Sequence, residues 1–326
     1  MKHALVFFLL FLHLGAGAQT DTNSKVSTKD TSKLVLSDEW SSDTKASPSK
    51  KRVLAVSGVH LAGYATTLAL LSEAWYEENE KTSFHTFDDS KEWLQVDKVG
   101  HAWTTYTIAR NSAASWSWAG LPHKKAVLLG GLSSIGFQTI LEYLDGHSRS
   151  WGWSWSDMGA NTLGAALYVS QELGWKQQLV QMKFSAHTVE HGELKSRAEA
   201  LYGPSLPERL LKDYNGQTYW LSFNSHIIAP GNTKWSWLSM ALGYGAKGLY
   251  GGFANVAYDG QGAVAFDRRD IRRVRQWYLS PDIDFTKIPT QRRGVRTLLS
   301  LLNMVKFPAP ALELSGGKLK GHLLYF

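Results

Sequence analysis

Asp97 and His101 lie four residues apart in the stretch DKVGHAWTTY, which otherwise has the composition of a buried helix. Residues four apart share one face of a helix, so this spacing places a carboxylate beside an imidazole. Such a pair can act as a general base oriented by an aspartate, or can bind a divalent metal ion together with further carboxylates. It can equally be the polar seam of a helix bundle, where the two groups only satisfy each other's hydrogen bonds.

Two later segments carry polar residues at the same helical spacing. A buried carboxylate without a partner is costly, so we expect the polar stripes to face one another, with the imidazole and an asparagine amide as donors. Small residues on the same segments, such as Gly130 and Gly164, would let the helices approach closely. The stripes are Asp97, His101 and Thr105; Ser134, Gln138 and Glu142; and Asp157 and Asn161. The sequence thus predicts one shared polar centre with the candidate site residues Asp97, His101, Glu142, Asp157 and Asn161.

Four helices must position these stripes. The expected helices cover residues 53–76, 94–114, 122–143 and 156–173. Pro122 suits the first turn of the third helix, and Ser156 is a good N-cap for the fourth. We therefore predict a four-helix bundle over residues 52–176. Other histidines are expected to be hydrogen-bonded or exposed rather than ligands: His60, His85, His147, His187 and His226.

The second half of the chain has the composition of a sheet. Ser205 and Glu208 form a capping box that opens a short helix, and Gly316-Gly317 is typical of a hairpin turn. Aromatic and β-branched residues predict strands over four segments: residues 179–187, 218–228, 275–285 and 319–326. The fold class is therefore α+β, with a β-rich region over residues 177–326 that forms a small sheet covering the bundle.

Three short motifs carry a family resemblance. DKVGH at 97–101, EYLDG at 142–146 and DMGAN at 157–161, in this order, resemble the signature of the YfiM-like family, predicted periplasmic proteins of unknown function. The stretch LPERLLKDYNGQTYWLS at 206–222 resembles the long members of that family, which carry a C-terminal extension. The helical part is more distantly similar to VanZ-like membrane proteins, although its helices are less apolar and more interrupted. The resemblance implies a fold and a polar core, and no activity.

The N-terminus indicates export. Lys2 and His3 precede an apolar run over residues 4–14, and Ala16-Gly17-Ala18 supplies a cleavage site, so residues 1–18 are expected to be a removed signal peptide. The alternative, an uncleaved anchor, has an apolar core shorter than the ~20 residues that a spanning helix needs. Polar residues 19–51 are expected to be a disordered linker. The chain contains no cysteine, which excludes disulfides, thiolate ligands and lipidation on cysteine. The expected location is the periplasm or outer membrane of a Gram-negative bacterium.

Positive charge is concentrated in one segment. The formal net charge is +7, and residues 266–296 hold nine Arg or Lys against four Asp. In an exported protein such a segment does not meet nucleic acid, so a membrane surface, anionic lipid or lipopolysaccharide is the nearest acidic partner. The favoured alternative is local pairing, for instance of Asp267 and Asp270 with the arginines three to five places further on. We expect a bundle that packs on itself or lies against a membrane, with Trp151, Trp153 and Trp155 in a core-facing row rather than an interfacial belt.

Two classes of function remain open. In the first, the protein is a non-catalytic envelope component whose polar centre is structural, with a structural or binding role at the periplasmic face of a membrane. In the second, the centre formed by Asp97, His101, Glu142 and Asp157 is a hydrolase or transferase site for a lipid-linked or phosphate-bearing substrate. The sequence has neither a His-Glu-x-x-His zinc motif nor a Gly-x-Ser-x-Gly turn. It favours the first class, assigns no cofactor, and leaves metal occupancy open.

Overall fold

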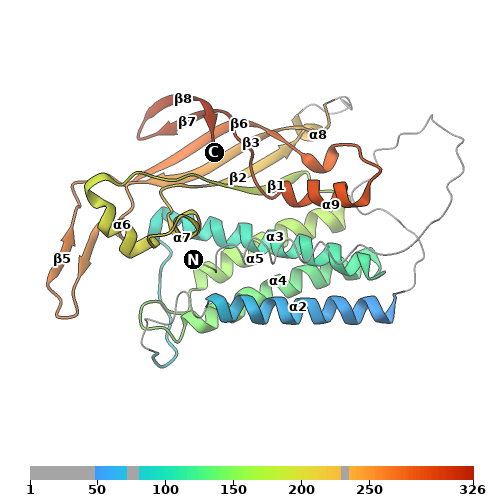
Figure 1. The fold of residues 1–326 in the computed structure, drawn as a ribbon, viewed down its shortest axis with the longest axis horizontal. Helices are drawn as coiled ribbons and strands as arrows, with labels where there is room; N and C mark the ends of the chain where they lie inside the picture. Colours follow the sequence, from blue (N-terminus) through green and yellow to red (C-terminus); the bar gives the residue numbers. More distant parts are fainter. Residues whose placement is uncertain (1–47, 72–80, 229–234) are drawn as a thin grey trace, which may run out of the picture.

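The fold is α+β, as predicted, with a helical first half followed by a β-rich second half. The computed structural model describes residues 48–71, 81–228 and 235–326. Four long helices lie side by side on one side of the sheet (Figure 1): α2 Lys50–Leu71, α3 Val96–Trp118, α4 His123–Asp145 and α5 Trp155–Trp175. The expected signal peptide and nearly all of the expected linker lie outside the described residues, and α2 begins inside the last two residues of that linker.

The helix starts differ from expectation for local reasons. Helix α3 begins at Val96 rather than two residues earlier, because Trp93, Leu94 and Gln95 have positive φ angles within the short 3-10 segment η2 Glu92–Gln95. Pro122 is the N-cap of α4 and so precedes its first turn. Positive φ is costly for side chains other than glycine, so neighbouring packing must hold the turn before α3.

The predicted N-cap of α5 was wrong. Ser154, not Ser156, caps this helix, and its Oγ accepts a hydrogen bond from the backbone N of Asp157 at 3.0 Å. Ser156 is already the second residue of the helix, whereas Ser154 precedes it and stands three residues before the backbone N–H that it caps. The helix then continues to Trp175, because the left-handed residue that ends it is Lys176 rather than a glycine.

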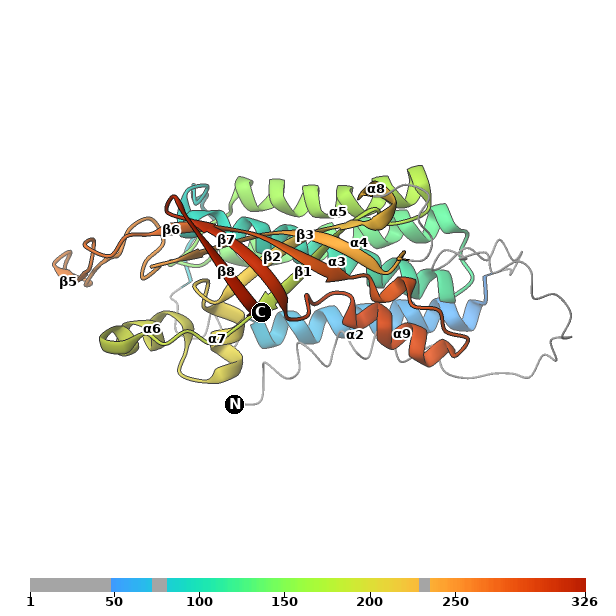
Figure 2. The same cartoon turned by 90° about the horizontal axis from the view of Figure 1, so that it is seen from above.

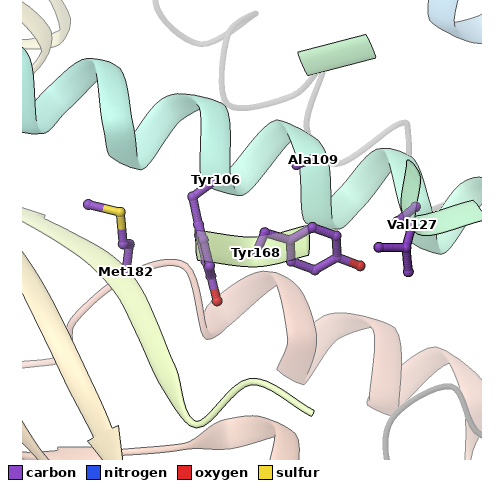
Figure 3. Close-up of a cluster of buried hydrophobic side chains, with 6 residues drawn as sticks. Tyr106, Ala109, Val127, Tyr168 and Met182 are labelled. Carbon is purple, nitrogen blue, oxygen red and sulfur yellow. The ribbon is translucent and has the colours of Figure 1, made fainter. Parts of the chain in front are cut away.

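Helix α3 is the central helix of the bundle. Tyr106 of α3 and Tyr168 of α5 meet edge to face with ring centroids 6.0 Å apart, within a buried cluster that also holds Met182 of the first strand (Figure 3). The small residues allow the expected close approach. A Cβ added at Gly130 would lie 2.5 Å from a carbonyl oxygen of α3, and one added at Gly164 would lie 2.1 Å from another.

Six antiparallel strands form one sheet in the order β1-β2-β3-β6-β7-β8. Their bounds are β1 Val180–Ala186, β2 Gln217–Asn224, β3 Leu238–Lys247, β6 Val274–Ile283, β7 Ala309–Ser315 and β8 Lys318–Tyr325. A separate hairpin of β4 Val256–Tyr258 and β5 Val264–Asp267 projects from the body (Figure 2). The expected strand at 218–228 ends at Asn224, where α8 Ser225–Ile228 begins. Strand β3 was not predicted, because its alternation is obscured by Gly243 and Gly245.

The sheet curls so strongly that its two ends approach each other, and we call it the curled sheet. Tyr325 of β8 hydrogen-bonds Thr218 of β2 at 3.0 Å, across the inside of the curl. The backbone N of Lys306, just before β7, donates to the carbonyl of Phe184 on the outer edge of β1 at 2.8 Å. A Cβ at Gly243 would lie 2.7 Å from the buried Trp220 ring, so this position needs glycine. One face of the sheet is therefore enclosed.

Shorter elements complete the second half: η3 Gly192–Leu194, α6 Lys195–Tyr202, α7 Leu206–Lys212, η4 Phe285–Lys287 and α9 Arg293–Leu302. The capping box of Ser205 and Glu208 is confirmed at the start of α7. The tryptophan row was wrong for Trp155, which is 71 % exposed because it is the first residue of α5 and not part of a strand.

Candidate polar centre

The imidazole of His101 lies between three helices and collects the predicted residues around it. Its Nδ1 is 3.3 Å from Asn161 Oδ1 and 3.7 Å from Glu142 Oε1. Its Nε2 is 3.7 Å from Asp157 Oδ1 and 3.9 Å from Asp97 Oδ1. The structure thus brings the five candidate residues from α3, α4 and α5 into one cluster. The His101 side chain is 22 % exposed, whereas that of Glu142 is 1 % exposed.

A lysine that the sequence reasoning left out stands in the middle of this cluster. Nζ of Lys98 lies 2.5 Å from Asp89 Oδ2, 3.0 Å from Asp97 Oδ2 and 2.7 Å from Asp157 Oδ1. The four-residue spacing missed Lys98, because it is the direct neighbour of Asp97, although the DKVGH motif contains it. Asp89 lies before α3 in a loop, where no helical period could have indicated it.

Hydrogen bonds tie two further segments to the centre. Ser154 and Ser156 at the start of α5 each donate from Oγ to Asp89 Oδ1, at 2.5 and 2.7 Å. The phenol of Tyr214, from the second half of the chain, donates to Asp97 Oδ1 at 2.7 Å. The centre therefore joins the loop before α3, the bundle and the region that leads into the sheet.

The amide of Asn161 closes the buried end of the centre. Its Oδ1 accepts hydrogen bonds from Thr105 Oγ1 and Gln138 Nε2, both at 2.9 Å. Ser134, the third polar residue of the α4 stripe, instead donates to the carbonyl of its own helix at Gly131. Among the described residues, Asn161 Nδ2 and Glu142 Oε1 have no hydrogen-bond partner, although both atoms are buried.

Burial and neighbouring charges shift the pKa values of the cluster in opposite directions. Burial raises the pKa of Glu142 to about 8 and that of Asp157 to about 7, against the lowering effect of the His101 charge. Burial would lower the pKa of His101, but the charges of Asp157, Asp97 and Glu142 outweigh burial and raise it. Burial would raise the pKa of Asp97, but His101, Lys98 and the Tyr214 hydrogen bond lower it. Glu142 and Asp157 therefore gain and lose their protons near neutral pH, whereas the pKa of Asp97 is lowered.

The same residues form a candidate metal site. Ligand atoms of Asp97, His101 and Asp157 all lie within 4.8 Å of one another, and oxygen and imidazole ligands suit many divalent ions. However, the Lys98 ammonium is within 3.0 Å of both aspartates. A divalent ion on these ligands would lie against that ammonium and be repelled by it. The donor set fits a metal, but the lysine already supplies the positive charge.

One helix of the bundle could by its length and composition cross a membrane. Among the described residues, only α4 is long and apolar enough to do so. The core helix of a bundle can have the same length and composition, and α4 is partly buried inside the protein. Its polar stripe of Ser134, Gln138 and Glu142 faces α3 and α5, so α4 is a packed member of the bundle.

These features define an α+β protein whose helical bundle surrounds a polar core centred on a lysine. Residues 85–171, which include the whole centre except Tyr214, match the family described as predicted periplasmic lipoprotein (DUF2279), whose function is unknown. This match agrees with the YfiM-like resemblance and with an uncharacterised exported protein of the periplasm. The more distant VanZ-like resemblance stays a prediction. No curated protein and no solved structure is detectably similar to the chain. The chain has no cysteine to carry the lipid that the family description names.

Proposed function

We propose that this chain is a non-catalytic envelope component with a structural role at the periplasmic face of a membrane, and that its polar centre holds the two halves of the protein together. The observation that carries the proposal is the position of Lys98. Its ammonium lies between Asp89, Asp97 and Asp157, where a catalytic site would leave room for substrate or metal. A buried ion network of this kind fixes how segments pack.

The other side chains of the centre support the same role. The hydroxyl of Ser154 both donates to Asp89 and accepts from the backbone of Asp157, so it ties the loop before α3 to the start of α5. Four carboxyls surround one lysine and one histidine, so the charges of the centre are paired within it. The bond from Tyr214 to Asp97 links the bundle to the second half.

A hydrolase or transferase acting on a lipid-linked or phosphate-bearing substrate is the second candidate. One observation favours it. Glu142 keeps a buried oxygen without a hydrogen-bond partner, and its raised pKa of about 8 would let it hold a proton at neutral pH as a general acid beside His101.

His101→Gln, studied together with metal analysis of the purified protein, separates these roles. If the centre is structural, glutamine keeps one hydrogen bond, and the free energy of unfolding falls by about 1 to 3 kcal/mol. Wild type and variant then hold equally little divalent metal, and chelator does not change the melting temperature. One divalent ion per chain in the wild type, lost in a variant that still folds, would overturn the structural proposal.

A further inference from the structure

The outer face of the curled sheet exposes apolar side chains, whereas a sheet that faces water exposes polar ones. On β3, Leu238, Met240 and Leu242 are 39, 38 and 49 % exposed, while the alternate residues Ser239 and Ala241 are buried. A half-exposed sheet normally turns its apolar residues inward and its polar residues out. On β3 the inward positions are therefore polar or small and the outward positions are apolar, while the inner side of the sheet also holds the buried rings of Trp220 and Tyr278.

The outward apolar residues form continuous rows across the strands. Strand register places Leu221, Leu242, Leu279 and Leu312 side by side over β2, β3, β6 and β7. A second row runs from Tyr244 through Trp277 and Leu314 to Leu319. We call the exposed members of these rows, together with Met240 of β3, the leucine face: Leu221, Met240, Leu242, Trp277, Leu279, Leu312, Leu314 and Leu319. Their exposed fractions range from 37 to 71 %.

Helix α3 covers this side of the sheet only near its first strands. Trp103 of α3 packs on Phe184 of β1 and Tyr219 of β2, with ring centroids 5.1 and 6.2 Å apart. Tyr219 is 7 % exposed as a result, whereas Leu242 and Leu279 of the next two strands are 49 and 42 % exposed. The apolar surface therefore continues past the edge of the bundle. Exposed apolar surface of this extent is characteristic of an interaction site.

The inner side of the sheet shows that this reversal is built into the fold. Lys183 and Asp282 form an ion pair of 2.7 Å with both side chains at most 1 % exposed, and Ser222 donates to the same carboxylate at 2.6 Å. Further along, Gln276 donates to Glu313 at 2.9 Å. The sheet satisfies its polar groups internally and leaves its leucines outside, which is the arrangement that lipid selects in membrane-contacting sheets.

Charged and aromatic groups at one border of the face identify its partner. Tyr244 and Trp277 lie in ring contact at 4.7 Å, and Nε of Arg275 donates to the Tyr244 hydroxyl at 3.2 Å. Tyrosine and tryptophan prefer the boundary between acyl chains and headgroups, and an arginine beside them attracts anionic headgroups. A protein partner would not require this order of apolar, aromatic and cationic groups.

We propose that the leucine face rests on the acyl chains of an anionic phospholipid leaflet, with Arg275 at headgroup level. This inference rests on the proposed role at a membrane and names the surface that makes the contact. The favourable contribution comes from the leucines, because each buried methylene removes apolar area from water. Arg275 adds an attraction that weakens with salt.

Flotation of the purified full chain with liposomes tests this surface. The liposomes contain phosphatidylethanolamine and phosphatidylglycerol. The test variant is Leu242→Ser, Leu279→Ser and Leu312→Ser combined, and the matched control is Leu206→Ser with Leu211→Ser, two leucines that are exposed on α7 away from the sheet. The triple variant is expected to lose roughly tenfold or more of its partition into the lipid fraction, while the control keeps it. Circular dichroism verifies that both variants fold.

A site-specific probe guards against an indirect effect. Because the chain has no cysteine, Leu279→Cys and Leu211→Cys each give one labelling site for an environment-sensitive dye. With liposomes, the dye at position 279 is expected to shift to the blue and to be quenched by acyl-chain quenchers, and the dye at 211 is not. Equal flotation of the triple variant and wild type would overturn the proposal. So would burial of residue 279 in a homodimer or against a protein partner without lipid. Failure here would leave the structural role of Lys98 untouched, since that role is measured by unfolding.

Discussion

The bundle and the curled sheet each bury a glutamate, but they treat it in opposite ways. Glu142 of the bundle is 1 % exposed and Glu313 of the sheet is 3 % exposed. Burial raises the pKa of Glu142 to about 8. Burial also opposes ionisation of Glu313, but hydrogen bonds from Gln276, Ser315, His322 and Lys247 outweigh it and lower the pKa to about 2. Glu142 receives one hydrogen bond, from the backbone N of Ser154 at 3.3 Å. The number of hydrogen-bond donors around a buried glutamate, more than its depth of burial, therefore decides whether it is charged.

The largest effect is expected from removing the cation of the bundle. Lys98→Met leaves three carboxylates without their shared partner, and breaking a buried ion pair typically costs about 3 to 5 kcal/mol. Lys195→Met is the control, because its ion pair with Glu199 is exposed on the surface and is worth less than about 1 kcal/mol. Urea unfolding monitored by circular dichroism measures both. Equal stability of the two variants would show that Lys98 does not hold the centre together.

Neutralising the two glutamates is expected to have opposite signs. Glu313→Gln leaves Lys247 and His322 without a charged acceptor and should destabilise the protein by about 2 kcal/mol. Glu142→Gln removes a carboxyl that folding forces to hold its proton, and should stabilise the protein at pH 8 by about 2 kcal/mol. Unfolding free energies at pH 8 decide the matter. A loss of stability in both variants would contradict the contrast between the two regions.

The pH profile follows from the same shifts. From pH 4.5 to about 8 the folded chain keeps on Glu142 a proton that the unfolded chain has released, so stability falls as pH rises through this window. Asp157, with a pKa of about 7, and His101, with a raised pKa, act in the same direction. Below pH 4.5, Glu313 loses its contribution as pH falls toward 2. Melting temperatures between pH 3 and 9 should therefore peak in the acidic range, and Glu142→Gln should flatten the alkaline decline.

The smallest effect is expected on the surface. Arg268 pairs with Glu193 and Asp270, and Arg269 pairs with Asp267, all near the projecting hairpin. Exposed pairs of this kind are screened by water and salt, so Arg268→Ala should leave the melting temperature unchanged. A clear loss of stability would mean that this segment packs more tightly than its exposure suggests. Charges in this part of the basic segment do pair locally, but over two residues rather than the expected three to five.

Helical period was the strongest signal in the sequence. The spacing of Asp97 and His101, and of Gln138 and Glu142, places each pair on one helix face whatever the surrounding fold, because an α-helix turns once in 3.6 residues. The capping box at Ser205 was equally local, since its two hydrogen bonds join residues three apart. The sequence could therefore indicate that these side chains share a polar seam.

Tertiary structure decided which other groups complete that seam. Asp89 and Tyr214 reach Lys98 and Asp97 from a loop and from the second half of the chain, and no spacing in the sequence links residues 117 positions apart. The pKa of Glu142 depends in the same way on how few donors the folded chain brings to it.

The orientation of the sheet shows the same division. Alternation along β6 determined that Trp277 and Leu279 share one face and Tyr278 and Ser280 the other, because side chains in a strand point to opposite sides in turn. Which face is enclosed is a different question, and alternation within one strand does not answer it. The curl that joins Tyr325 to Thr218 encloses the face of Tyr278 and Ser280 and leaves the leucines outside. That outcome depends on contacts between the second strand and the last, and only the folded chain brings them together.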